Sequence, residues 1–296
     1  MAILEVEQLT YTYPGRSAPA LQDITFQAEA GQMIGIIGPN GSGKSTLCLA
    51  LAGMIPSLYN GTIQGSVKIN GLDTRQYTAG QFAGTVGLVL QNPANQLSHM
   101  RYTVYEEVAF GLENLGVTRA DMPARIEAAL EQVGLSALRN RSPYTLSGGQ
   151  QQRLALASVL VMQPPVLVLD EPTAMLDPGG GQAVFEILKQ LVFAGSTVIL
   201  AEHRLEWIAR YANQVIALAN GTMIETGPPE VVMTSPQLLQ NGTGWLRYTQ
   251  AVQMGLTRGL WQTKQPLPVT LEQAAASFQR IHLDRDCGGQ YRENTA

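Results

Sequence analysis

The fold can be predicted from one stretch of the sequence, Gly38-Pro39-Asn40-Gly41-Ser42-Gly43-Lys44-Ser45-Thr46. It lies between an apolar run, Met33–Ile37, and a segment with the composition of a helix, Lys44–Ala52. A glycine-rich loop that connects a strand to a helix is typical of phosphate binding, because glycines let closely spaced backbone N–H groups surround a polyphosphate. The N-terminus of the helix adds a partial positive charge. The stretch therefore predicts a nucleotide-binding loop.

Two side chains of this loop suit a nucleotide and its metal ion. Lys44 can reach the β- and γ-phosphates of ATP, and the Ser45 hydroxyl can coordinate Mg²⁺. A glycine-rich turn with a chance lysine would share the letters of the motif, but not its place between a strand and a helix. The residues expected to bind the nucleotide are Asn40, Gly41, Ser42, Gly43, Lys44, Ser45 and Thr46.

The sequence around the loop alternates short apolar runs with amphipathic segments, which is typical of an α/β fold with a largely parallel sheet. Helices are expected over Pro123–Val133 and over Gln182–Phe193, which end at Gly134 and Gly195. Central strands covered on both faces read as continuous apolar runs. Four runs have this character: Met33–Ile37, Val86–Leu90, Val166–Leu169 and Thr197–Ala201.

Other segments predict antiparallel strands and an extension. Leu9, Tyr11 and Tyr13 alternate with polar residues, which indicates a half-exposed strand. Asn220-Gly221 suits a type I′ turn, so we expect a hairpin around it. Beyond Pro236 the composition changes, with Trp245, Trp261 and a capping-box pattern at residues 270–273, and these features predict a small, mostly helical extension.

The composition and the charge limit the classes of protein to which the chain can belong. A net charge of −4 and a pI near 5.5 disfavour a nucleic-acid-binding protein, which usually has a basic face. The longest apolar run, Leu154–Met162, is shorter than the ~20 residues that a membrane-spanning helix needs. The N-terminus lacks the features of a secretion signal, and Cys48 and Cys287 have no metal-binding spacing, so we expect two free thiols in a soluble, cytosolic chain.

The apolar run at Val166–Leu169 ends in two carboxylates, Asp170 and Glu171. Because strands of a parallel sheet end at the ligand crevice, Asp170 is expected beside the phosphate loop, where it can coordinate Mg²⁺ directly or through water. Glu171 is then the natural general base for the attacking water. Acidic residues also follow strands simply because turns are hydrated, and the phosphate loop upstream is what favours the functional interpretation.

A second candidate anion site lies at Leu146-Ser147-Gly148-Gly149-Gln150, before a helix expected over Gln151–Val161. Ser147 and Gln150 have the spacing of a capping box, and the glycines expose backbone N–H groups at the start of a helix. An ordinary capped helix would have the same pattern, so the physical argument leaves both interpretations open.

These motifs together resemble the ATP-binding-cassette (ABC) family over residues 1–236, because residues 146–150 are identical to its signature motif and the other motifs follow in its order. The resemblance implies a P-loop α/β domain with an N-terminal antiparallel β subdomain, a helical subdomain at about 92–163, and a C-terminal extension at 237–296. It also implies a partner cassette packed head to tail, so that each ATP lies between one phosphate loop and the partner cassette's signature motif.

The same resemblance implies roles for single residues. Ser147, Gly148 and Gly149 would bind the partner cassette's ATP. Tyr13 would stack on adenine, although most strand tyrosines simply pack. Gln91 would contact the metal ion and the attacking water, and His203 would hold the γ-phosphate, although a lone histidine after a strand is more often structural. Asp177 would bridge the two cassettes.

Two positions depart from the family pattern. Ala174 stands where the loop after the acidic strand usually begins with serine, and Arg204 follows His203 where many cassettes have aspartate. Neither change removes a catalytic group, but the first puts the coupling between the two ATP sites in doubt.

Within the family, the runs at residues 91–97, 103–116 and 201–206 resemble the ATPases of energy-coupling-factor importers for cobalt, nickel and vitamins. The implied function is an ATPase at the cytoplasmic face of the membrane, with a second ATPase subunit, a transmembrane coupling subunit and a substrate-capturing membrane subunit as partners, and without nucleic acid. The alternatives are an ordinary ABC importer or exporter, a soluble non-transport cassette, and a regulatory subunit that binds ATP without hydrolysing it. The transported substrate and the identity of the second cassette are not encoded in these motifs.

Overall fold

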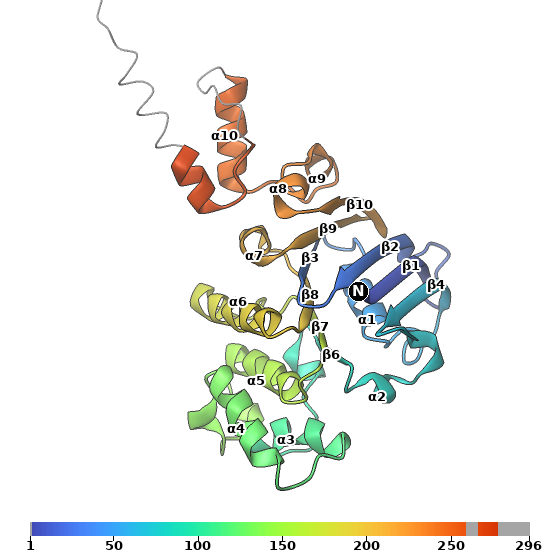
Figure 1. Cartoon of the computed structure of the whole chain (residues 1–296), viewed down its shortest axis with the longest axis vertical. Coiled ribbons are helices and arrows are strands. Elements are labelled where there is room, and N and C mark those ends of the chain that lie inside the picture. Colours follow the sequence, from blue (N-terminus) through green and yellow to red (C-terminus); the bar gives the residue numbers. More distant parts are fainter. Residues whose placement is uncertain (1, 259–265, 278–296) are drawn as a thin grey trace, which may run out of the picture.

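The computed structural model describes residues 2–258 and 266–277, which form two sheets and the helices around them (Figure 1). The larger, six-stranded sheet has the order β10-β9-β3-β8-β7-β6, in which all strands from β9 to β6 are parallel and β10 is antiparallel. Its strands are β3 (Met33–Ile37), β6 (Val86–Val89), β7 (Val166–Asp170), β8 (Thr197–Ala201), β9 (Gln214–Ala219) and β10 (Thr222–Gly227). All four predicted central strands are confirmed.

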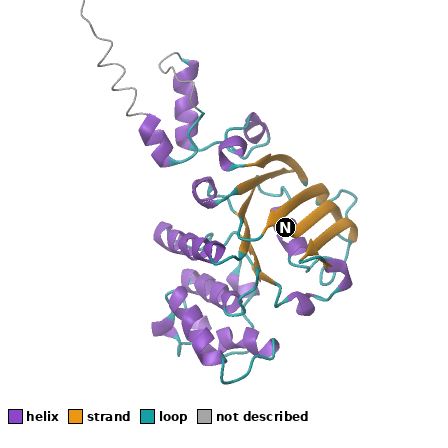
Figure 2. Ribbon diagram, viewed as in Figure 1, coloured by secondary structure: helices purple, strands orange, loops and turns teal. Residues whose placement is uncertain are grey.

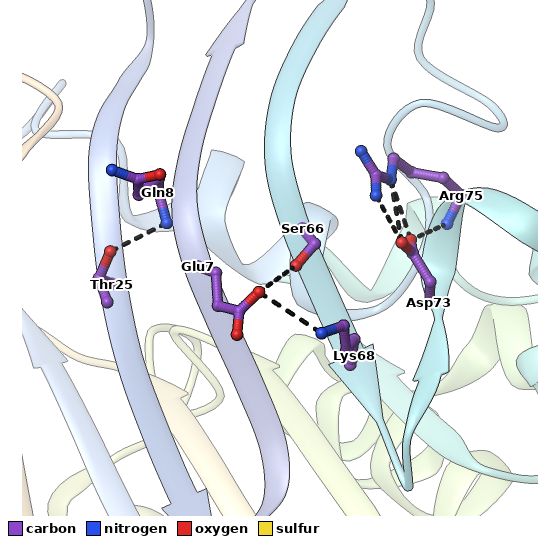
Figure 3. Close-up of polar contacts among 7 residues, drawn as sticks. All are labelled: Glu7, Gln8, Thr25, Ser66, Lys68, Asp73 and Arg75. Atoms are coloured by element: carbon purple, nitrogen blue, oxygen red, sulfur yellow. Dashed lines mark hydrogen bonds and ion pairs between the residues drawn. The ribbon is translucent and has the colours of Figure 1, made fainter.

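The smaller sheet is antiparallel, with the order β2-β1-β4-β5, and forms the N-terminal subdomain. Its strands are β1 (Ala2–Thr12), β2 (Leu21–Glu29), β4 (Thr62–Ile69) and β5 (Leu72–Asp73). Polar side chains link the strands on its outer surface, where Glu7 of β1 accepts hydrogen bonds from Ser66 and Lys68 of β4 (Figure 3). Nearby, Asp73 pairs with Arg75 (Figure 3).

The larger sheet is covered on both faces (Figure 1). Ile34 and Ile36 of β3 belong to the core shared with the antiparallel sheet and α1 (Lys44–Leu51), whereas Met33 and Ile37 face the helices on the other side. That other side carries α5 (Gly148–Leu160), α6 (Pro178–Phe193) and α7 (Leu205–Tyr211) (Figures 1 and 2). This alternation explains why the strand is apolar at every position.

A helical region follows β6 and lies at one end of the molecule (Figure 1). Helix α3 (Val104–Asn114) begins at a capping box between Thr103 and Glu106, and its Val104, Val108 and Leu112 are fully buried, as its spacing indicates. A short connection leads to α4 (Met122–Gln132), and a longer one over residues 133–147 leads from α4 to α5. The remaining short helices here and beside the small sheet are Thr74–Gln76, α2 (Ala79–Phe82), Pro93–Asn95, Ser136–Leu138 and Pro143–Thr145.

The C-terminal extension packs against the opposite end of the larger sheet (Figure 1). It follows α8 (Pro229–Val232) and contains most of α9 (Pro236–Gln240), α10 (Arg247–Thr257) and a helical turn over residues 271–277. Thr270 and Gln273 form the predicted capping box, and Trp245 donates its indole N–H to the carbonyl of Ser235. The described residues of this part of the chain are largely helical, whereas Trp261 and Cys287 lie outside the described part of the chain.

Two helix starts were predicted too late. Helix α6 begins at Pro178 rather than at Gln182, because Asp177 caps it through the amide of Gly180 (2.7 Å) and the proline fits the first helical turn. Its first turn therefore contains three glycines, Gly179–Gly181, whose low helix propensity hid it. Helix α5 begins at Gly148 for the same reason, since Ser147 caps it. Among the helices of the described residues, none combines the length and the apolarity needed to cross a bilayer.

Candidate nucleotide-binding site

The phosphate loop leaves β3 and enters α1, and its backbone is in conformations that only glycine adopts easily. Gly38 has φ +154°, and a Cβ there would lie 2.3 Å from the carbonyl oxygen of Leu218. Gly43 has φ +103°, and a Cβ there would lie 2.8 Å from the carbonyl oxygen of Ala20. Two of the loop's glycines are therefore required by close backbone contacts as well as by the turn itself.

Segments far away in the sequence support this loop. The predicted hairpin turn at Asn220-Gly221 is present, with φ +50° and +79°, as a type I′ turn requires. The amide of Gly221 donates to the carbonyl of Ser42 (3.0 Å), and its carbonyl accepts from the amide of Gln22 (2.8 Å). The turn therefore ties the phosphate loop to both sheets, a role that the sequence did not indicate.

Lys44 is almost fully buried beneath the loop, and its ammonium group donates to the carbonyls of Gly38 (2.9 Å) and Pro39 (3.1 Å). Burial lowers the pKa of Lys44, and the nearby carboxylates of Glu171 and Asp170 partly offset that effect. The ammonium group is held by two carbonyls, which a polyphosphate can replace with stronger, charge-assisted hydrogen bonds.

A cavity of about 650 Å³ opens over the loop. Asn40, Gly41 and Lys44–Thr46 line it from the phosphate loop, and Gln91, Glu171 and Asn220 line it from the strand ends and the hairpin. Beneath it, the buried Ser42 Oγ and Asp170 Oδ1 atoms have no hydrogen-bond partner. Buried polar atoms without partners are rare, and a phosphate or a metal ion bound beside the loop would supply partners of the kind that such atoms lack.

The acidic strand end fits a Mg²⁺ site. Burial raises the pKa of Asp170, and a hydrogen bond from the Ser45 hydroxyl and the charge of Lys44 act against this shift. Asp170, at the end of β7, and Ser45, at the start of α1, therefore lie close to each other. A carboxylate and a hydroxyl beside a phosphate cradle are a suitable donor set for Mg²⁺, which prefers oxygen ligands and shares them with substrate phosphates.

Glu171 stands between the two other predicted catalytic residues. Its Oε2 atom accepts a hydrogen bond from the Gln91 Nε2 atom (2.7 Å), and its Oε1 atom lies 2.8 Å from the His203 Nε2 atom. Glu171 has φ +49°, a left-handed backbone conformation that is uncommon outside glycine. Three residues from the ends of three strands therefore converge at the edge of the cavity.

Tyr13 lies beside this cavity. Its hydroxyl is 3.2 Å from the Thr46 hydroxyl, and its ring packs edge-on against that of Tyr11, with 4.8 Å between the centroids. Tyr13 is thus hydrogen-bonded to Thr46, the last residue of the phosphate-loop motif. Its predicted stacking on adenine stays a prediction.

The signature residues form a separate hollow of about 480 Å³ on the same chain. Ser147 and Gly149 line it together with Leu176 and Asp177. Ser147 forms the expected capping box, accepting from the amide of Gln150 (3.3 Å), and Gly148 is the first residue of α5. These residues are not brought to the phosphate loop of their own chain.

Comparisons with known proteins agree with this geometry. The sequence pattern of the family described as "ABC transporter" matches residues 21–174. A putative ABC transporter ATP-binding protein of Pyrococcus abyssi is 45% identical over 241 residues, 81% of this chain and 85% of that protein. The chain belongs to the ABC transporter family. It is accordingly an ATPase, the ATP-binding subunit of a transporter.

Other relatives of this ABC subunit are named more specifically. The energy-coupling factor transporter ATP-binding protein EcfA1 of Levilactobacillus brevis is 39% identical over 279 residues, 94% of this chain and 90% of that protein. The solved structure of cbiO1 from Clostridium perfringens, part of the ABC transporter complex cbiONQ, has a TM-score of 0.70 at 31% identity and covers 87% of this chain and 96% of its own. A dimeric post-hydrolysis state of the cassette MJ0796, bound to ADP and phosphate, has a TM-score of 0.69 at 27% identity, covering 76% and 98%.

The sequence did not indicate all polar residues around the ABC site. Glu202, next to His203, is 3% exposed and bonds to Thr173, and Arg204 donates to the carbonyl of Leu176 (3.1 Å). Arg204 stood out as a departure from the family pattern, but its contact could not be deduced from that. No sequence signal pointed to the burial of Glu202.

Proposed function

We propose that the chain energises an importer of the energy-coupling-factor type, and that two cassettes enclose each ATP between the phosphate loop of one and the signature residues of the other. The separation of the two half-sites supports this proposal. The cavity at Asn40–Thr46 and the hollow at Ser147–Gly149 are different surfaces of one chain. A second cassette, identical or homologous, would bring one of each together.

Hydrolysis in this proposal depends on Glu171 as the general base. Its carboxylate, which is bonded to Gln91 and lies beside His203 at the cavity edge, would accept a proton from a water that attacks the γ-phosphate. This arrangement is the observation that carries the proposed mechanism.

Other residues would position the substrate. Lys44 would exchange its carbonyl partners for the β- and γ-phosphates, and His203 would contact the γ-phosphate. Ser45 and Asp170, with Gln91, would hold Mg²⁺, which when bound neutralises charge on the phosphates. Tyr13 would contact adenine, and Asp177 would face the partner cassette.

A groove beside the helical region would receive the membrane partner. It has a volume of about 440 Å³ between β6 and helices α3 and α5, with Val86, Phe110 and Met162 among its apolar residues. Glu107 lies at its base, buried and fixed by the amide and hydroxyl of Ser98 (2.6 and 2.7 Å). A short amphipathic helix of a coupling membrane subunit matches such a groove, since its apolar face would be covered there.

Gln96 lines this groove and accepts a hydrogen bond from the amide of Leu90 (2.9 Å), the residue before Gln91, so movement of a docked helix would reach Gln91 and thereby Glu171. The chain would then work peripherally, at the cytoplasmic face of the membrane, with a coupling subunit and a substrate-capturing subunit. The substrate class, a metal ion or a vitamin, is proposed from the relatives named EcfA1 and cbiO1.

Replacing Glu171 by glutamine tests the mechanism. Glu171→Gln should retain ATP binding and lose turnover by ~10²–10⁴-fold, the usual contribution of a general base. The exposed Glu131→Gln, on the far end of α4, is the matched control and should hydrolyse ATP like the wild type. Near-normal turnover in Glu171→Gln would contradict the assignment of the base.

The importer class is tested separately, by tagging the chain, solubilising native membranes in detergent and identifying copurifying proteins by mass spectrometry. A coupling membrane protein together with a small substrate-capturing one is expected, and the second would name the substrate class. Two large permease subunits, ribosomes or no partner at all would contradict the importer class and leave the ATPase unaffected.

A further inference from the structure

A buried carboxylate joins two loops at the edge of the nucleotide site. Glu202 follows β8, and its Oε2 atom accepts hydrogen bonds from the amides of His203 (2.7 Å) and Arg204 (3.1 Å). Its Oε1 atom accepts a hydrogen bond from the hydroxyl of Thr173, which is itself 1% exposed. One side chain therefore fixes the backbone around His203 and, at the same time, the loop that follows Glu171.

Arg204 makes the second link between these loops. Its Nη2 atom donates to the carbonyl of Leu176 (3.1 Å), and its Nη1 atom lies 3.3 Å from the ideal Cβ position of Gly181, in the first turn of α6. The guanidinium group thus binds the residue before Asp177 and lies against the first turn of the helix that follows it. Arginine is suited to this position because its donors are arranged in a rigid, planar fork.

The link continues to the signature residues. The Leu176 side chain lies 3.2 Å from the ideal Cβ position of Gly149, and both residues line the hollow at the start of α5. A continuous series of contacts therefore runs from His203, beside Glu171, through Arg204 and Leu176 to Gly149. Buried, charge-assisted contacts of this kind resist separation, because a buried carboxylate left without its donors is costly.

We propose that Glu202 and Arg204 are positioning residues that make the loop Thr173–Asp177 move together with His203, and so couple each chain's own ATP cavity to its signature surface. The inference rests on the proposed function, in which these two surfaces contact two different ATP molecules. It assigns a role to Arg204, the position at which the chain departs from the family pattern, and to the buried Glu202 beside it.

The first test measures the loop in the nucleotide-free chain, by amide hydrogen exchange of peptides covering residues 173–181. Arg204→Ala should speed exchange there by about tenfold or more, the effect of losing a charge-assisted hydrogen bond. Arg204→Lys should restore part of the protection, since its ammonium can still donate one bond. Arg210→Ala, an exposed arginine of the neighbouring helix α7, is the control and should exchange like the wild type.

The second test measures coupling between sites, from turnover as a function of ATP concentration in the assembled transporter. Arg204→Ala and Thr173→Val should lower kcat by roughly tenfold, as mispositioned groups do. They should also lower the Hill coefficient toward that of independent sites and leave ATP binding to the single chain within about twofold. Thr173→Ser retains the hydroxyl and should behave like the wild type.

Three outcomes would overturn the inference. Unchanged exchange in Arg204→Ala would show that the contact does not order the loop. Unchanged cooperativity, or a loss of ATP binding as large as the loss of kcat, would show that the residues act on stability alone. Failure of the proposed function would give a different result. Glu171→Gln would then form no ATP-bound dimer in size-exclusion chromatography, whichever residue stands at position 204.

Discussion

Substituting Gly43 by alanine should separate the two demands that the phosphate loop makes on its glycines. A residue with a side chain at φ +103° costs about 1–2 kcal/mol in backbone strain. The added Cβ would also lie 2.8 Å from the carbonyl oxygen of Ala20, and relieving that overlap costs a further ~1–3 kcal/mol. We expect a total loss of unfolding free energy of roughly 2–5 kcal/mol.

Gly71 supplies the matched control, because it has φ +76° and no atom within 4 Å of its ideal Cβ position. Gly71→Ala should therefore lose only the strain contribution, about 1–2 kcal/mol. Urea unfolding of both variants without nucleotide measures the difference, and ATP titration should show weakened binding for Gly43→Ala alone. Equal unfolding midpoints for the two variants would refute the argument that the contact with Ala20 shapes the loop.

Three further predictions concern the surroundings of the site. Hydrogen bonds from Arg75 lower the pKa of Asp73, so the pair stabilises the fold above the unfolded-state pKa of ~3.9, and this contribution is lost as the pH falls through the lower folded-state pKa. Asp73→Asn should therefore lower the unfolding free energy, measured in urea at pH 7, by under about 1 kcal/mol, because Arg75 is 41% exposed. The loss should become progressively smaller in acid. Glu107→Ala removes the acceptor of both the amide and the hydroxyl of Ser98 and should lower the unfolding free energy by about 1–3 kcal/mol. If the losses in Ser98→Ala and Glu107→Ala simply add in the double mutant, the side-chain interaction between the two residues is contradicted. Phe185→Ala empties a fully buried ring position between α6 and α7 and should cost ~3–5 kcal/mol in the same assay, whereas a loss under 1 kcal/mol would show that the site collapses around the cavity.

The parts of the fold that could be predicted depend on local signals. The apolar run at residues 33–37 and the glycine pattern after it indicate the strand, the loop and the start of α1 without knowledge of any distant residue. The first turn of α6 could not be predicted in this way, because its glycines disfavour a helix. Only the cap at Asp177 shows that the helix begins there, and the sequence suggested a different role for that residue.

The residues of the candidate site could be proposed from the sequence, but most of the contacts between them could not. Glu171 was expected near the phosphate loop from its strand, but its hydrogen bond with Gln91, 80 residues away, depends on the order of the strands in the sheet. Glu202 was missed because a carboxylate after a strand is usually hydrated. Its burial follows from the hydroxyl and amides that surround it, which only the assembled fold brings together.

The Asn220-Gly221 turn has a consequence for how freely the protein can vary. A solvent-facing hairpin tip normally accepts many residues. Here a Cβ on Gly221 would lie 2.7 Å from the carbonyl oxygen of Ala20, and the backbone of Gly221 bonds to the phosphate loop on one side and to β2 on the other. A saturation-mutagenesis survey that scores ATP hydrolysis should therefore rank Gly221 with the core residues, while the turn at Gly71, which has no atom near its ideal Cβ position, tolerates substitution better.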